Sequence, residues 1–147
     1  MLDFLQSRRI RLLWTALIHI GASANPVSGK ELAQKLDCSR RYLESDLQAL
    51  SQHGLLESRR GAHGGYVLAR NPQRISLHDV LSCLNEETPP DNDCNCPVQN
   101  QIVVPQIKQV QESLNAKLNA ISLADALQQA AQAHLMQLPA STPDFSI

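Results

Sequence analysis

The chain has 147 residues, of which 43% are hydrophobic and 18% are charged. This length fits one compact domain, or a small domain joined to an assembly element, and the composition excludes a wholly disordered chain. The sequence holds one Trp, two Tyr and two Phe, so its core must be built from Leu, Ile, Val and Ala, which favours helices.

The charge is unevenly distributed although the net charge is only −1. Residues 1–80 contain eleven Lys and Arg against seven Asp and Glu, which gives +4, and residues 81–147 contain two Lys against seven acidic residues, which gives −5. A basic first half favours an anionic partner for that part of the chain.

Residues 2–22 are predicted to form the first helix, with Ile10, Leu13, Leu17 and Ile20 on one face. The overlapping stretch "SRRIRLLWTALIHIGASA" is similar to a secretion signal, but Asp3 before it and a histidine within the apolar run do not suit a leader. The run is also far shorter than the roughly 20 apolar residues of a membrane span. We therefore expect a helix of a cytoplasmic protein.

Two short helices follow. Ser28 and Glu31 have the spacing of a capping box, which predicts a helix in "SGKELAQKL", and Ser39 is a good N-cap for the helix "RRYLESDLQALSQHG", which Gly54 should end. Leu43, Leu47 and Leu50 share one face of the second helix. The opposite arc is polar and consists of Arg40, Arg41, Glu44, Ser45, Gln48 and Gln52. This pattern is typical of a helix-turn-helix with a polar recognition helix.

Three glycines in "GAHGG" raise the question of a phosphate-binding loop. Such a loop needs a helix leading out of it, whereas here "LLESRR" and "GYVLAR" read as strands on either side of "GAHG". The segment is therefore predicted to be a β-hairpin, the wing of a winged helix-turn-helix. Its tip carries Arg59, Arg60, Gly61, His63, Gly64 and Gly65, and it suits a minor groove or a phosphate backbone.

The rest of the chain is predicted to be helical apart from one loop. Ser76 should cap a helix in "SLHDVLSCL", the segment "NEETPPDNDCNCPVQNQ" reads as an acidic loop, and Ser122 with Asp125 should open the last helix. Between them Ile107, Val110, Leu114 and Leu118 form a narrow seam of coiled-coil type, which one helix cannot bury alone. We expect a DNA-binding domain at 1–84, a cysteine-bearing loop at 85–101, a dimerisation helix and C-terminal helix at 102–138, and a tail at 139–147.

The motifs "S-x-x-Y-L", "L-x-x-x-G-L", "R-G-x-x-G-G-Y-x-L" and "I-S-L-x-D-V" occur in this order between residues 39 and 80. Together they resemble the winged helix-turn-helix of the IscR/NsrR/CymR-type (Rrf family) bacterial regulators, and "LNAISLADAL" resembles the end of that family's long helix. The resemblance implies a mainly α-helical fold with a small β-hairpin. It also implies a homodimeric transcription regulator whose long helices (about 102–119) cross and whose recognition helices read a palindrome. We expect this regulator to be a repressor.

Carried over by position, the resemblance places two sets of residues on double-stranded DNA. The major-groove set is Ser39, Arg40, Arg41, Tyr42, Ser45 and Gln48, and the minor-groove set is the wing tip named above. Arg8 and Arg9 could contact phosphate. Ile107, Val110, Leu114 and Leu118 would form the dimer interface.

Many members of the family hold an iron–sulfur cluster through three cysteines. Here Cys94 and Cys96 are present, but Gln99, Asn100 and Gln101 occupy the region of the third cysteine, so a cluster would need atypical ligands such as Cys83. A thiol switch, a soft metal bridging thiolates, and a loop that senses nothing remain alternatives. A family member without a cofactor, controlled by a partner protein or a small ligand, is a further alternative. No histidine, serine or carboxylate pattern indicates an enzyme.

Overall fold

The computed structural model describes residues 3–84 and 96–139. It is mostly helical with one two-stranded antiparallel hairpin, which confirms the expected fold class. The α-helices and strands are α1 (Arg8–Ala22), α2 (Gly29–Lys35), α3 (Arg40–Gln52), β1 (Leu56–Arg59), β2 (Gly65–Leu68), α4 (Leu77–Leu84), α5 (Val104–Ala120) and α6 (Leu123–Gln132). Short 3₁₀ turns lie at Asp3–Gln6 and Pro72–Arg74, and a π-helical turn lies at Gln99–Val103.

The helix starts follow the predicted caps. At Ser28 and at Ser122 the side-chain hydroxyl accepts a hydrogen bond, 3.1 Å long in both cases, from the backbone amide three residues further on. Ser76 makes a reciprocal box: its Oγ accepts from the Asp79 amide at 3.2 Å while Asp79 Oδ2 accepts from the Ser76 amide at 2.8 Å. Each cap satisfies amides that a helix leaves without an internal partner.

The first helix is shorter than the prediction of residues 2–22. Ser7 interrupts it, because its Oγ accepts from the Ile10 amide at 3.3 Å and so starts α1 one residue later. The preceding residues, Asp3–Gln6, form a separate 3₁₀ turn. Serine competes for backbone amides in this way, which is why it favours helix starts over helix interiors.

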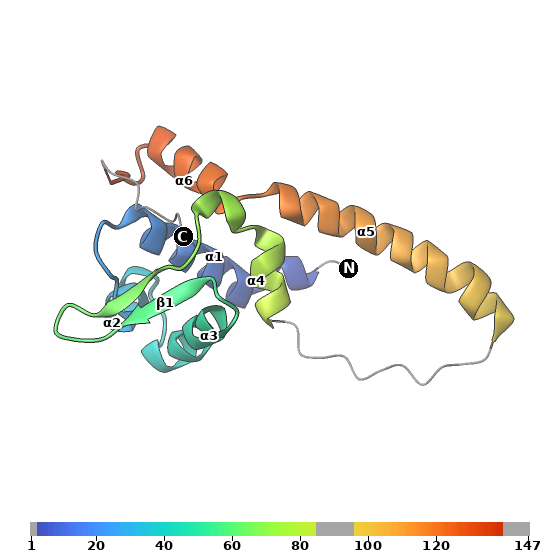
Figure 1. Cartoon of the computed structure of the whole chain (residues 1–147), viewed down its shortest axis with the longest axis horizontal. Coiled ribbons are helices and arrows are strands. Elements are labelled where there is room, and N and C mark those ends of the chain that lie inside the picture. The colour runs from blue at the N-terminus through green and yellow to red at the C-terminus, as the bar shows by residue number, and fades with distance from the viewer. Residues whose placement is uncertain (1–2, 85–95, 140–147) are drawn as a thin grey trace.

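The main core lies around α1. Leu13, Leu17, Leu32, Leu47 and Leu50 are fully buried there, and the cluster also includes residues of β1, β2, α4 and α6. The helix-turn-helix, the hairpin and the last helix therefore form one packed unit (Figure 1).

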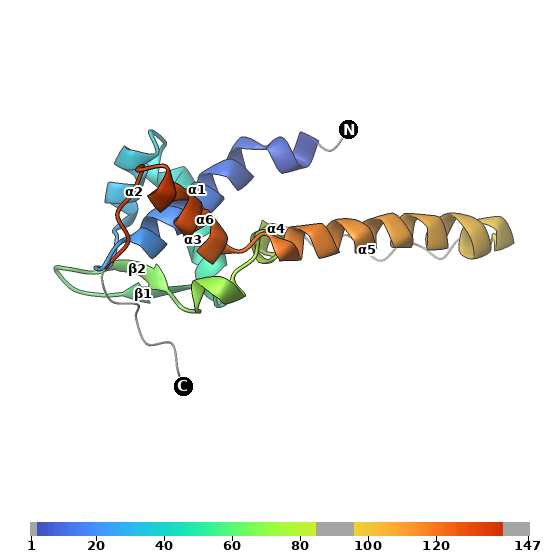
Figure 2. The ribbon, with the colours of Figure 1, turned by 90° about the horizontal axis from the view of Figure 1, so that it is seen from above.

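Within residues 3–84 and 96–139, the long helix α5 is attached to this unit at one end only. Leu118 is 7% exposed and is buried with Ile10 of α1 and Leu81 of α4, and Leu114 packs against the same cluster. From there α5 extends away from every other labelled helix and strand (Figures 1 and 2). Leu118, expected at the dimer interface, is thus buried within its own chain.

A π-helical turn precedes α5, whereas a regular helix over 102–119 was expected. Within it the Val104 amide donates to the carbonyl of Gln99, five residues back. Pro105 follows, and because proline has no amide hydrogen it cannot donate to the carbonyl of Gln101 as a regular α-helix requires. Over residues 3–84 and 96–139, no helix has both the length and the apolar character needed to cross a membrane.

Candidate nucleic-acid interface

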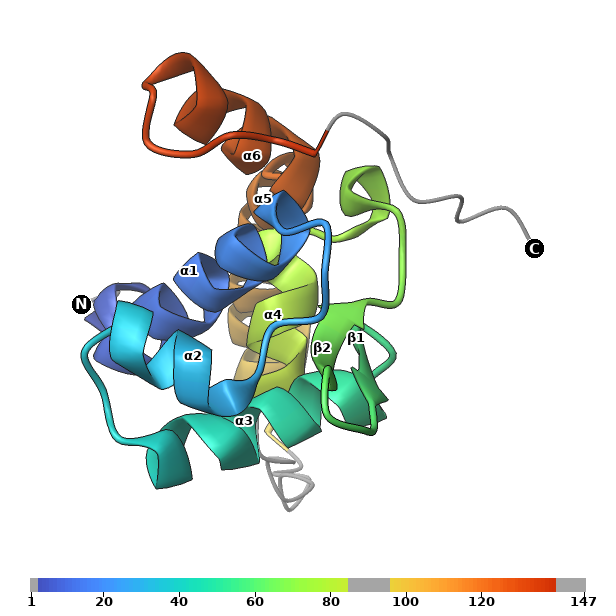
Figure 3. The same cartoon turned by 90° about the vertical axis from the view of Figure 1, so that its left-hand side faces the viewer.

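The recognition helix α3 presents a polar surface to solvent. Leu43, Leu47 and Leu50 hold its other side in the core. Exposed residues on or next to α3 include Ser39, Arg40, Arg41, Tyr42, Ser45 and Gln48, and also Gln52 and His53 at its C-terminal end. They include the whole major-groove set expected from the sequence, and Tyr42, at 48% exposure, is a large apolar ring open to solvent. Figure 3 shows α3 along one side of the domain, with the hairpin beside it and α6 on the opposite side.

An ion pair that the sequence did not suggest fixes α3 to α1. Asp46, on the buried side of α3, accepts hydrogen bonds from Arg9 Nε at 3.0 Å and 3.1 Å, and its side chain is 5% exposed. Arg9 was expected to contact phosphate, but its guanidinium is engaged with this carboxylate. A buried carboxylate needs such a partner, so the pair sets the position of the recognition helix.

Glu44 also differs from the expectation, since it faces the protein and not the exposed arc. Its Oε1 accepts a hydrogen bond from the Tyr66 hydroxyl of β2 at 2.8 Å, and its Oε2 lies 3.7 Å from Arg40 Nε. Burial, together with the hydrogen bond and charge of Glu44, raises the pKa of Tyr66 to about 12. The Tyr66 hydroxyl therefore stays protonated at neutral pH and links the wing to the recognition helix.

The wing is a regular hairpin in which Leu56 pairs with Leu68 and Arg59 pairs with Gly65. At its tip Arg59, Arg60, Gly61 and His63 are exposed, whereas Gly64 and Gly65 are partly buried. At its base the Arg70 guanidinium donates to the carbonyls of Gly54 and His53, at 3.1 Å and 3.0 Å, beyond the last turn of α3. A cation there offsets the negative end of the helix dipole and ties the wing to α3.

Two of the wing glycines serve the fold. At Gly65 (φ +154°) a Cβ would lie 2.6 Å from the Val27 carbonyl oxygen, because Val27 and Tyr66 form a β-bridge with N–O distances of 3.0 Å and 2.8 Å. Val27 thus adds a one-residue third strand that the sequence did not indicate. At Gly64 a Cβ would collide with the Arg59 carbonyl oxygen. Only Gly61 (φ +115°), with open space around it, leaves room for a ligand.

The cysteines expected to act as a sensor are not gathered in the described part of the chain. Cys94 lies outside the described residues, and Cys96 precedes the helical segment that leads into α5. Cys83 packs against the main core and its thiol donates to the Asp79 carbonyl at 3.1 Å. Burial, and then the Asp79 charge, raises the pKa of Cys83 to about 11, so the thiol is protonated at neutral pH. Residues 3–84 and 96–139 contain no group of three or more His, Cys, Asp or Glu placed to hold a metal, so by themselves they do not fit an iron–sulfur cluster.

The residues expected at a dimer interface divide into two pairs. Ile107 and Val110 are 62% and 70% exposed on the projecting part of α5, whereas Leu114 and Leu118 pack within the chain. Further exposed apolar residues are Val104 at the start of α5 and Val98, Ile102 and Val103 in the helical segment just before it.

A helix-turn-helix whose second helix exposes arginines, with a basic hairpin beside it, defines a DNA-binding protein of the winged helix-turn-helix class. The family model Rrf2, described as an iron-dependent transcriptional regulator, matches residues 6–129. The chain belongs to the Rrf2 family of transcription regulators. Because this family consists of regulators and not enzymes, the expectation that the chain is not an enzyme is confirmed.

Individual relatives agree with this assignment. The chain is 34% identical over 126 residues to Protein rrf2 of Nitratidesulfovibrio vulgaris, with 82% of each chain covered. It is 42% identical over 59 residues to the regulator CymR of Bacillus subtilis, covering 40% of this chain and 43% of that one. Among solved structures, IscR of T. potens superimposes with a TM-score of 0.65 at 30% identity, covering 89% of this chain and 91% of that one.

Proposed function

We propose that this chain binds a palindromic operator as a homodimer in the cytoplasm and represses transcription there. The observation that carries the proposal is the row of exposed side chains on α3 next to the basic wing tip. The N-terminal part of such a helix reads base edges in the major groove, while the wing contacts the adjacent minor groove or backbone.

Selection of bound duplexes from a random pool tests the operator. A dimer with two recognition helices should enrich an inverted repeat whose half-sites lie about one helical turn apart. Enrichment of no sequence, or of a single half-site with no symmetry, would contradict the proposal. Transcription in vitro from a promoter carrying the enriched sequence distinguishes repression from activation.

The role of α3 is tested by replacing Arg40 and Arg41 with Ala together. Removal of one base or phosphate interaction costs about 1–3 kcal/mol, so operator affinity should fall at least 30-fold. The matched control is Lys35→Ala with Arg74→Ala, which removes the same charge from exposed positions in the same domain that lie outside the proposed DNA contacts. Equal reductions in affinity for the two double variants would show a general charge effect and would remove α3 from the interface.

We further infer that DNA affinity is regulated through the Cys94/Cys96 segment, by an iron–sulfur cluster, by thiol oxidation or by a bound metal. The family description names iron, and Cys96 lies next to the helical segment that leads into α5.

The decisive measurement is the visible absorption spectrum, with iron and sulfide analysis, of protein purified without oxygen. Broad absorbance with stoichiometric iron and sulfide identifies a cluster. A colourless, iron-free protein that binds DNA leaves thiol oxidation or another metal. If oxidant and metal leave DNA binding by this wild-type protein unchanged, or change it equally in the Cys94→Ser/Cys96→Ser variant, control by a partner protein or a small ligand replaces the cysteine hypothesis.

A further inference from the structure

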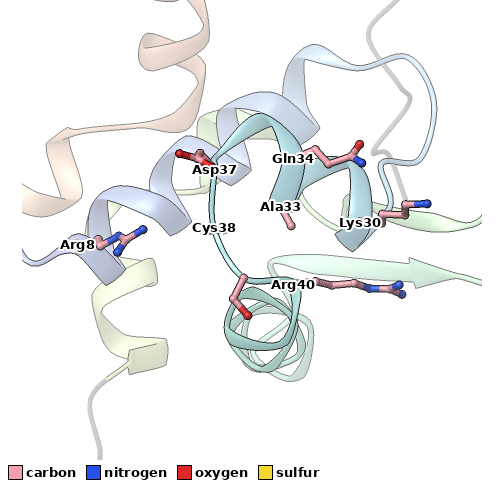
Figure 4. Close-up of a pocket in the computed structure, with 8 residues that line it drawn as sticks. Arg8, Lys30, Ala33, Gln34, Asp37, Cys38 and Arg40 are labelled. Atoms are coloured by element: carbon pink, nitrogen blue, oxygen red, sulfur yellow. The ribbon is translucent and has the colours of Figure 1, made fainter.

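An open pocket of about 570 Å³ lies beside the start of the recognition helix. Its walls come from the start of α1, from α2, and from the turn that leads into α3, and they include Arg8, Lys30, Asp37, Cys38, Ser39 and Arg40. In Figure 4, Lys30 and Arg40 extend in the same direction at one side of the pocket, and Arg8 points inward from the other side.

The pocket gathers positive charge from three helices. The lining contains Arg8, Lys30 and Arg40 and a single carboxylate, that of Asp37, so it carries a net charge of +2. Among the described residues neither Arg8 nor Lys30 has a carboxylate within ion-pair distance, whereas Lys35 on the same helix as Lys30 pairs with Glu31 at 3.0 Å. Arg40 pairs with Glu44 at 3.7 Å, so Arg8 and Lys30 are the two cations of the lining that an anion in the pocket would neutralise.

The remaining donors at the pocket also suit an anion. The Ser39 hydroxyl makes no capping hydrogen bond to α3, although Ser39 is the N-cap residue. The hydroxyl and the first amides of this 13-residue helix therefore stay available to a ligand. These donors add to the charge of the three cationic side chains that define the pocket.

We propose that this pocket seats a backbone phosphate of the bound DNA, with Arg8 and Lys30 as phosphate contacts at the edge of the groove that α3 enters. The inference rests on the proposed DNA-binding function. The pocket opens at Ser39 and Arg40, where α3 begins, so a strand bordering the groove passes directly over it. Contacts of this kind set the register of a recognition helix without reading sequence. A free phosphate or nucleotide has the same chemistry and is the alternative occupant.

The salt dependence of binding to a mixed-sequence duplex of about 40 base pairs tests the pocket. Removal of one phosphate interaction lowers the magnitude of the slope of log K against log salt by about one unit. Arg8→Gln and Lys30→Gln should each lower it by about two in a dimer. Lys35→Gln, with the same charge change on α2 outside the pocket, should leave the slope nearly unchanged.

The outcomes separate this inference from the function on which it rests. A wild-type protein that fails to bind the duplex at any salt concentration overturns both. A wild-type protein that binds, with Arg8→Gln and Lys30→Gln indistinguishable from Lys35→Gln, overturns the pocket alone. A third outcome is that millimolar inorganic phosphate or nucleotide competes with the duplex for wild type but not for Lys30→Gln, while the salt slopes of all variants are equal. This outcome would assign the pocket to a small anion and overturn its role on DNA.

Two other residues of the pocket lining provide further tests, one through DNA affinity and one through the rate of thiol alkylation. Asp37→Asn removes the one carboxylate and keeps a residue that tolerates the left-handed backbone at this position (φ +49°). It should tighten DNA binding several-fold, and weaker binding would contradict the proposal.

The alkylation rate of Cys38 tests whether DNA covers the pocket. Bound duplex should slow the reaction of Cys38 with iodoacetamide at least 5-fold, as measured by peptide mass spectrometry. An unchanged rate would place the DNA elsewhere.

Discussion

The projecting part of α5 allows a quantitative prediction about assembly. Burying an Ile or Val side chain completely contributes about 1.5–3 kcal/mol. Ile107 and Val110 are 62% and 70% exposed, so a partner helix that covers them gains about 1–2 kcal/mol from each. A symmetric dimer buries both residues from both chains, which gives about 4–8 kcal/mol from these four side chains.

Ile107→Ser with Val110→Ser should therefore raise the dimer dissociation constant by at least about 10³-fold. Sedimentation equilibrium over a range of protein concentrations measures it. The control is Gln109→Ser with Ala116→Ser, two exposed positions on the opposite side of α5 by helical spacing, which should leave the constant within a few-fold of wild type. A wild-type protein that is monomeric at 100 µM, or a seam variant that dimerises as tightly as the control, would refute this reasoning.

The remaining predictions concern the domain itself. Gly65→Ala should lower the free energy of unfolding by about 2 kcal/mol or more, because the new methyl group breaks both hydrogen bonds of the adjacent β-bridge. Gly61→Ala, in open space, should lower it by about 1 kcal/mol. Equal destabilisation of the two variants in urea unfolding would contradict this difference. Arg9→Ala should cost about 2–3 kcal/mol by leaving the buried Asp46 carboxylate unpaired, and the double variant with Asp46→Ala should be less destabilised than Arg9→Ala alone. Cys83, with its pKa raised from 9.0 to about 11, should react with iodoacetamide about 100-fold more slowly than an unfolded thiol at pH 8. Since the folded pKa is the higher one, the contribution of this thiol to stability should be constant below pH 9 and fall between pH 9 and 11; a reaction rate that stops rising below pH 9 would show the pKa to be wrong.

Local signals made much of the fold predictable. Ser28, Ser76 and Ser122 each stand three residues before an acidic residue, and each begins a helix in the structure. The alternation in "GYVLAR" and the glycines before it identified the hairpin, because these signals depend on neighbours within a few residues.

What the sequence did not reveal depends on contacts between distant segments. The Arg9–Asp46 pair spans 37 residues and the Tyr66–Glu44 hydrogen bond spans 22. Helical periodicity placed Glu44 on the polar arc, and only the position of β2 turns its carboxylate toward the protein. Leu118 continues the seam of α5 in the sequence, yet it packs on α1 and α4, because periodicity marks a buried face without naming what covers it.

In the described part of the chain α5 joins the DNA-binding unit at one end, so this end acts as a pivot about which the helix can tilt. At the pivot Ser76 Oγ donates to Asn119 at 3.2 Å, and the Leu77 amide donates to the Ile121 carbonyl at 3.0 Å. Its 17 residues span about 25 Å, so a tilt of about 5° at the pivot moves the far end by about 2 Å. A small displacement near Cys96 therefore produces only a slight rotation where α5 meets α1 and α4. Conversely, a partner helix that binds the exposed half of α5 can set its tilt, and with it the distance between the two recognition helices of a dimer.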